Sequence, residues 1–212
     1  MRARSKLSLA LSLSSLALVA CGGACPEASA TTAATSGSES APTLRDPNAA
    51  PESITVTIGG LDAAGRFADT QVFSGFGCTG GNQSPELSWT GAPEGTQAYA
   101  IVMHDPDAPT GVGFFHWVLT DLPAGTTQLA AGAASAEGGL PAGVIQAYTD
   151  FGANGYGGPC PPPGAPHRYE ITVYALDTAS LGVPAGATGA LVRFMLGQHT
   201  LALGRATATY GR

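Results

Sequence analysis

The sequence has few charged residues, which make up 11% of its 212 positions, and only 9 of them are Lys or Arg. The formal net charge is −6, and no basic run exists outside the extreme N-terminus. A nucleic-acid-binding surface needs clustered cations to neutralise phosphates. We therefore expect no nucleic-acid partner.

The sequence also lacks a long hydrophobic run. The apolar stretch at residues 7–20 is too short to span about 30 Å of hydrocarbon comfortably as a helix. It follows three basic residues and ends in "LVAC", which resembles the bacterial lipobox, where the Cys becomes the lipidated first residue of the mature chain. We predict a signal peptide over 1–20, lipid on Cys21, and an exported, membrane-anchored lipoprotein of the cell envelope.

Apolar anchors are scarce between residues 21 and 52, where Ala, Ser, Thr, Gly and Pro predominate. Such a segment cannot bury enough surface to offset its ordering entropy, so we expect a flexible tether. The remaining residues, 53–212, are expected to form one domain, and we find no internal repeat.

The 30 Gly and 16 Pro residues favour many turns and short strands over long surface helices. Apolar or alternating stretches predict strands at 54–58, 99–105, 114–121 and 167–177, and one helix is expected at 188–198. This pattern indicates a mainly β fold, an antiparallel sandwich of two sheets with a late helix.

Alternation is clearest in the last predicted strand, where one face carries Tyr169, Ile171, Val173 and Ala175. The other face carries Arg168, for which we expect a structural salt bridge or a surface contact. In the helix, Leu191, Met195 and Leu196 are expected to face inward.

Titratable side chains gather at the ends of the predicted strands. Asp105 ends one strand, His116 lies within an aromatic strand, and His167 and Tyr169 share a face because they are two residues apart. If these ends are neighbours, they form a pocket in which Asp105 orients and polarises His116. Phe114, Phe115 and Trp117 would form its walls or the packing behind them.

Structural roles are also open to these residues. An Asp that precedes Pro commonly starts a turn, His116 could be a satisfied core histidine, and His167 and Tyr169 could be ordinary strand residues. His104 and His199 are expected to be structural.

A Gly- and Pro-rich loop, 155–166, leads into His167. Its glycines, Gly158 among them, let the backbone approach a ligand, while prolines such as Pro159 stiffen the frame. Successive exposed amides in such a loop can form an anion-binding nest, so a small anion could bind within an acidic protein.

The motifs "DPDAP", "HW", "GPCPP" and "HRYEITVYALD" occur in this order and together resemble the phosphatidylethanolamine-binding protein (PEBP) family, in its bacterial Raf kinase inhibitor-like branch. The resemblance covers roughly residues 52–212. It implies a two-sheet, antiparallel, Greek-key β-sandwich with a C-terminal helix. It also implies a cis peptide at Ala108–Pro109.

The resemblance further implies a pocket for phosphate-like groups, phosphoryl headgroups or small carboxylates, lined by Asp105, Asp107, His116, His167 and Tyr169. Some members of the family inhibit kinases or proteases. One departure is that Phe114 and Phe115 precede the His, where the bacterial pattern usually has Trp, so an indole donor is lost.

Export makes a disulfide possible, and Cys78 and Cys160 both lie in loops that we place near the pocket, so we propose that they pair. Two buried or free thiols are the alternative, and Cys25 would be left over.

We expect no cofactor and no metal, because no tight ligand spacing such as His-x-x-x-His occurs. A hydrolase would need a nucleophile, and Ser84 is the only Ser in an attractive loop, outside any Gly-x-Ser-x-Gly elbow. We therefore predict a binder of a small, phosphate-bearing anion that does not turn it over. The alternatives are an inhibitor of an envelope kinase or protease, and an esterase-like enzyme.

Overall fold

The structure is a computed structural model that describes residues 46–134 and 139–212. The predicted signal peptide, Cys21, Cys25 and most of the predicted tether lie outside these residues. In the described part of the chain, no helix combines the length and apolar character needed to cross a bilayer.

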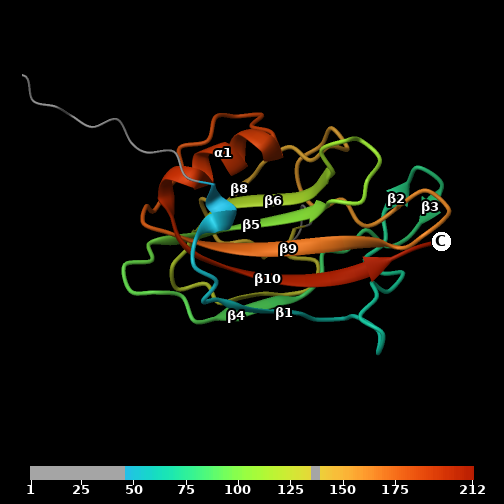
Figure 1. The fold of residues 1–212 in the computed structure, drawn as a ribbon, viewed down its shortest axis with the longest axis horizontal. Helices are drawn as coiled ribbons and strands as arrows, with labels where there is room; N and C mark the ends of the chain where they lie inside the picture. Colours follow the sequence, from blue (N-terminus) through green and yellow to red (C-terminus); the bar gives the residue numbers. More distant parts are fainter. Residues whose placement is uncertain (1–45, 135–138) are drawn as a thin grey trace, which may run out of the picture. The chain divides into compact units, whose positions relative to one another are not determined.

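The described residues form three antiparallel sheets, one α-helix and one 3-10 helix (Figure 1). The largest sheet has the strand order β10-β9-β5-β6-β8, a second has the order β1-β4-β7, and β2 pairs with β3. In chain order the elements are η1 (Pro47–Ala49), β1 (Thr55–Ile58), β2 (Ser74–Gly75), β3 (Cys78–Thr79), β4 (Leu87–Thr90), β5 (Ala98–Asp105), β6 (Phe114–Pro123), β7 (Gln128–Leu129), β8 (Ile145–Gln146), β9 (His167–Leu176), α1 (Gly189–His199) and β10 (Thr200–Tyr210).

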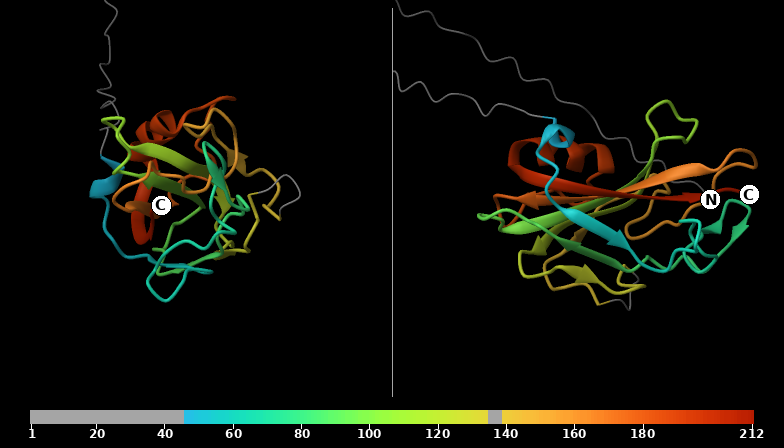
Figure 2. Two further views of the ribbon diagram at one scale, coloured as in Figure 1. Left: turned by 90° about the vertical axis from the view of Figure 1, so that its right-hand side faces the viewer. Right: turned by 60° about the horizontal axis from the view of Figure 1, so that its bottom comes forward.

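The five-stranded sheet lies between α1 and the sheet that contains β1 and β4 (Figure 2). One apolar cluster fills the space between the two sheets and includes Leu87, Trp89 and Trp117. A second cluster lies on the α1 side and includes Tyr174, Val192 and Leu196. The predicted sandwich of antiparallel sheets with a C-terminal helix is confirmed.

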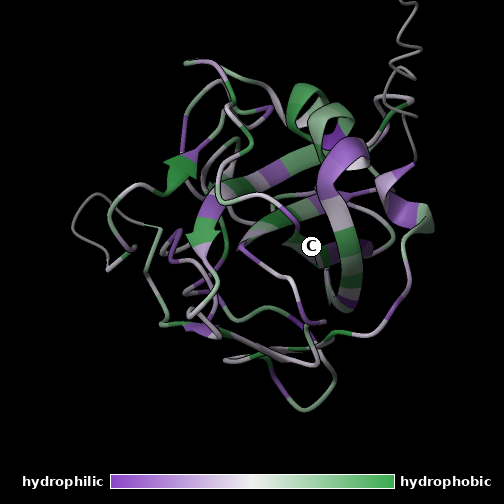
Figure 3. Cartoon of the chain, turned by 90° about the vertical axis from the view of Figure 1, so that its left-hand side faces the viewer, coloured by the Kyte–Doolittle hydropathy of each residue, from purple (hydrophilic) through white to green (hydrophobic). Residues whose placement is uncertain are grey.

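The alternation predicted for residues 167–177 is present in β9. Tyr169, Ile171, Val173 and Ala175 join the cluster between the sheets, whereas Tyr174 joins the cluster beneath α1. Alternating hydrophobic and hydrophilic bands are visible along strands in Figure 3. The strand thus has a buried residue on both faces, because α1 covers the face that would otherwise meet water.

The helix α1 begins after Thr188, whose hydroxyl accepts a hydrogen bond from Leu191 N and so caps the first turn. The prediction that Leu191 faces inward is wrong, because its side chain is exposed and Val192 and Leu196 are the fully buried residues. Met195 is partly buried against the same cluster.

Residues 46–52, which the sequence places in the tether, contact the domain. Asn48 accepts hydrogen bonds from the Tyr174 hydroxyl and from Arg205, and Arg205 also forms an ion pair with Glu52 at 2.8 Å. The ordered contacts of the domain therefore begin at least as early as Asp46.

Candidate functional site

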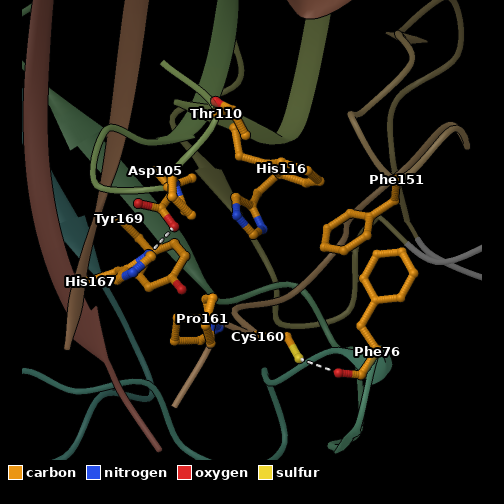
Figure 4. A pocket seen from close by; sticks show the side chains of 13 residues that line it. Phe76, Asp105, Thr110, His116, Phe151, Cys160, Pro161, His167 and Tyr169 are labelled. Carbon is orange, nitrogen blue, oxygen red and sulfur yellow. Dashed lines mark hydrogen bonds and ion pairs between the residues drawn. The ribbon is translucent and has the colours of Figure 1, made fainter. Parts of the chain in front are cut away.

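Three strand ends meet at the end of the five-stranded sheet that lies near β2 and β3. There β5 ends at Asp105, β6 begins at Phe114 and β9 begins at His167. They border a cavity of about 200 Å³, which Figure 4 shows from close by. Asp105, His116, His167 and Tyr169 all line this cavity, so the structure brings four predicted site residues together.

Asp105 is hydrogen-bonded to His167. The Nδ1 atom of His167 lies 2.7 Å from Asp105 Oδ2, and the carboxylate is almost fully buried. The other oxygen, Oδ1, accepts a hydrogen bond from the backbone N–H of Asp107. The prediction that Asp105 orients His116 is therefore wrong: His167 is its partner, because β5 pairs with β9 and places their ends side by side.

His116 occupies a β-bulge in β6. Met103 is opposite Trp117 and His104 is opposite Phe115, so His116 has no residue opposite it. Bulges re-aim side chains, and here the imidazole turns toward the cavity. The backbone carbonyls of Gly157 and Gly158, at 2.8 and 3.2 Å, are acceptors, so Nδ1 must carry the proton.

Burial governs the charge of His116. Because the side chain is almost completely removed from water, its pKa falls to about 4, although the carbonyl of Gly157 and the charge of Asp105 oppose this shift. His116 is therefore neutral near pH 7. Its second nitrogen, Nε2, then has a free lone pair and can only accept a hydrogen bond.

Tyr169 contributes a buried hydroxyl group. Its ring is fully buried against His116 and Phe67. Its hydroxyl oxygen has no hydrogen-bond partner among the described residues. Burial, followed by the charge of Asp105, raises the pKa of this phenol far above its usual value. The hydroxyl thus stays protonated and is an unused donor beside the cavity.

Asp107 does not line the cavity, although the sequence placed it among the binding residues. Its carboxylate instead accepts two hydrogen bonds from the Arg168 guanidinium, at 2.9 and 2.7 Å, and a third from the Arg168 backbone. The structural salt bridge expected for Arg168 is present, and it holds the "DPDAP" loop against the start of β9.

Arg168 hydrogen bonds lower the pKa of Asp107 to about 2. A lowered carboxyl pKa means that the ion pair contributes its full stabilisation above about pH 4 and loses it as the pH falls toward 2. We expect Arg168→Gln to return the Asp107 pKa most of the way toward the ordinary value of about 3.9. Carboxyl NMR titration measures this shift, and an unchanged pKa would show that the backbone amide of Arg168 sets it.

Gly158 and Pro159 are also not lining residues of the cavity, and the N–H groups of Gly157 and Gly158 bind protein acceptors. The N–H of Gly158 donates to Asn82 Oδ1, and the N–H of Gly157 donates to the carbonyl of His116. A Cβ atom at Gly158 would collide with the backbone of Gln71. This glycine therefore permits a close approach between two loops, where we expected an approach to a ligand.

The predicted cis peptide is wrong. Ala108–Pro109 is trans, since no peptide bond of the described residues is cis. Of the three aromatic residues expected to form walls or packing near His116, Phe114 lines the cavity. Phe115 packs against His104 and Arg193 on the α1 side, and Trp117 lies in the core.

The remaining histidines make structural contacts, as expected. His104 Nε2 lies 3.1 Å from the carbonyl of Val112, and burial, followed by the charge of Arg193, lowers its pKa. His199 Nδ1 lies 2.9 Å from Asp177 Oδ1, at the C-terminal end of α1.

The predicted disulfide between Cys78 and Cys160 is present and forms part of the cavity wall. Arg212 joins the same two loops, because its guanidinium donates to the carbonyls of Pro161 and Gly77 at 2.7 and 2.9 Å. One covalent bond and one cation therefore fix the wall opposite Asp105.

Sequence reasoning missed two aromatic residues of the cavity, Phe76 and Phe151. Each is a large apolar residue in a Gly-rich loop, "SGFGC" and "DFGANG", which was the available signal. Across residues 46–134 and 139–212, no group of three His, Cys, Asp or Glu residues could hold a metal ion.

Comparison with known proteins identifies the family of this chain. The family model described as Phosphatidylethanolamine-binding protein matches residues 63–211. The chain belongs to this family. It is 44% identical over 157 residues to YbcL of Escherichia coli (strain K12), and this alignment covers 73% of this chain and 86% of YbcL.

The PEBP-family fold is supported by a solved structure as well. The crystal structure of E. coli YbcL, described as a new member of the mammalian PEBP family, matches with a TM-score of 0.72 and 42% identity. The match covers 76% of this chain and 99% of YbcL. LppC of Mycobacterium tuberculosis (strain ATCC 25618 / H37Rv), which is named as a lipoprotein, is 36% identical over 64% of this chain and 63% of its own length.

Proposed function

We propose that this PEBP-family protein binds a small, phosphate-bearing anion in the cavity and does not convert it chemically. One observation carries the proposal: the Tyr169 hydroxyl is buried beside the cavity without a hydrogen-bond partner among the described residues. A buried donor that is left unsatisfied costs about 1–3 kcal/mol. A ligand oxygen would supply the missing acceptor.

The polar groups of the cavity match a singly protonated phosphate group. Tyr169 offers a donor, whereas neutral His116 offers an acceptor at Nε2. A phosphate monoester with one proton carries both oxygen acceptors and one O–H donor, so it can satisfy both residues. His167, which is hydrogen-bonded to Asp105 through Nδ1, adds its second ring nitrogen, Nε2, to the polar groups of the cavity.

The candidate nucleophiles near the cavity, two hydroxyl groups and one sulfur, are already engaged in other contacts, which supports binding without catalysis. The Thr110 hydroxyl donates to the carbonyl of Gly113 at 2.6 Å, and the Cys160 sulfur is in a disulfide. Ser84, the nucleophile considered for an esterase, is buried and accepts from Ala134 N, and it is not among the lining residues. No activated nucleophile faces the ligand in this proposal.

Tyr169→Phe is expected to weaken phosphate binding by about tenfold or more, because it removes a hydrogen bond to a charged oxygen. The same variant should be as stable as the wild type or more stable by about 1 kcal/mol, because the lost hydroxyl is unsatisfied. Calorimetry with phosphate, phosphoethanolamine and acetate measures the binding, and urea unfolding measures the stability.

Tyr156→Phe is the matched control. The Tyr156 hydroxyl is also buried, but it donates to the carbonyl of Gln71 at 3.0 Å and does not line the cavity. This variant should lose about 1 kcal/mol of stability and bind the anions unchanged. The proposed function would be disproved if none of the three anions gave a heat of binding and if His167→Ala gave the same calorimetric trace as the wild type.

We also propose that the protein is an exported lipoprotein anchored through Cys21. The similarity to LppC and the Cys78–Cys160 disulfide support this location, since disulfides persist in oxidising compartments. Inhibition of an envelope kinase or protease stays a prediction, to be tested by pull-down with the anchor removed.

A further inference from the structure

The cavity has a second wall that the phosphate proposal does not use, and this wall is aromatic. Phe76, Phe114 and Phe151 line it, and Phe73 stacks behind Phe151 with ring centroids 4.0 Å apart. Figure 4 shows Phe76 and Phe151 on one side of the cavity and Asp105 and His167 on the other. The cavity is therefore divided into a polar half and an aromatic half, with His116 in between.

The backbone of Phe76 is held in an unusual conformation. Its φ angle is +49°, in the left-handed region that bulky residues rarely adopt, and its ring is 71% exposed. Arg212 donates to the carbonyls of Phe76 and Gly77, and the disulfide begins at Cys78. Strain of this kind persists where the surroundings impose it, and it clusters at ligand sites.

The rings of the aromatic wall contact one another and form one continuous apolar surface along the cavity. Phe76 and Phe151 have centroids 5.5 Å apart, and Phe114 meets Phe151 edge-on at 4.8 Å. The whole cavity, at about 200 Å³, is only slightly larger than the roughly 150 Å³ of an engineered cavity that binds benzene. One aromatic ring with a small head group therefore fits its size, whereas a pair of long acyl chains exceeds it.

We propose that the ligand is an aryl phosphate or a similar aryl-bearing oxyanion on a small molecule. Its ring would contact Phe76, Phe114 and Phe151, and its anionic group would reach Tyr169 and His116. This inference rests on the proposed function, which assigns the anionic group to the polar half of the cavity, and it adds the chemical class of the rest of the ligand. Aromatic pairs favour edge-to-face or offset contacts, worth about a 2- to 10-fold gain in affinity each beyond area burial.

The test compares phenyl phosphate, butyl phosphate and inorganic phosphate by calorimetry on the full chain. We expect phenyl phosphate to bind about tenfold more tightly than butyl phosphate, which has a similar apolar bulk without a ring. Phe76→Leu and Phe151→Leu should remove this preference, so that phenyl phosphate and butyl phosphate bind each variant with similar affinity. Phe76→Leu alters an exposed ring, so its folding should be unaffected.

Phe194→Leu is the matched control. Phe194 is 55% exposed on α1, does not line the cavity, and should keep the full preference for phenyl phosphate. Equal affinities for phenyl and butyl phosphate, with binding of inorganic phosphate retained, would overturn the aryl site and leave the proposed function standing. A failure of all three compounds to bind would overturn both.

Discussion

Replacing Cys78 and Cys160 together by Ser is expected to lower the free energy of unfolding by about 4 kcal/mol. The disulfide joins residues that are 82 positions apart. Opening so long a loop restores chain entropy to the unfolded state, and the loop-closure relation gives about 4–5 kcal/mol at this length before any strain is subtracted. Guanidinium unfolding of the wild type and of the double variant measures the difference.

The same double variant should also bind phosphate less tightly, because Phe76, Pro161 and the disulfide border the same cavity. Wild-type protein unfolded in the presence of reductant is the control and should show the same loss of stability. A loss below about 1 kcal/mol would mean that packing and the Arg212 hydrogen bonds hold the two loops without the covalent bond.

Acidification from about pH 6.5 to pH 4 should cost about 3 kcal/mol of stability through His116 alone. Burial lowers the pKa of His116 to about 4 in the folded protein, whereas an unfolded histidine has a pKa of about 6.5. Between these values the unfolded chain takes up a proton that the folded chain does not. Stability is therefore complete above pH 6.5 and falls as the pH decreases toward 4.

His116→Asn isolates this effect, because the Asn amide can still donate to the carbonyl of Gly157 but does not titrate. The variant should show a flatter dependence of stability on pH in this range. The carboxylates titrate in both proteins, so the difference between the stability curves of the wild type and the variant reports His116. Parallel curves would show that His116 is protonated in the folded state near pH 6.

The strands that the sequence predicted best are those whose side chains alternate strictly. Within 167–177 the period of two identifies both the strand and its inner face, as β9 confirms. β10 was not predicted, because Thr200 follows His199 of α1 with no turn residue between them and Gly204 interrupts the apolar pattern. Leu191 was misassigned because α1 carries apolar residues on all its faces, and packing against the sheet decides which of them are buried.

The convergence of Asp105, His116, His167 and Tyr169 could be predicted, because each lies at a strand end or on an inward face. The partner of Asp105 could not, since it depends on the long-range pairing of β5 with β9. The orientation of His116 depends on a bulge that leaves no mark in the residue pattern.

The packing of η1 beside α1 has a consequence for how the protein meets its ligand. η1 lies toward the α1 end of the five-stranded sheet, whereas the strand ends that border the cavity, the end of β5 and the start of β9, lie near β2 and β3 (Figure 1). An attachment made through the residues before Asp46 would therefore enter the domain away from the cavity and would leave the opening uncovered. Molecules dissolved in the surrounding water would then reach the cavity directly.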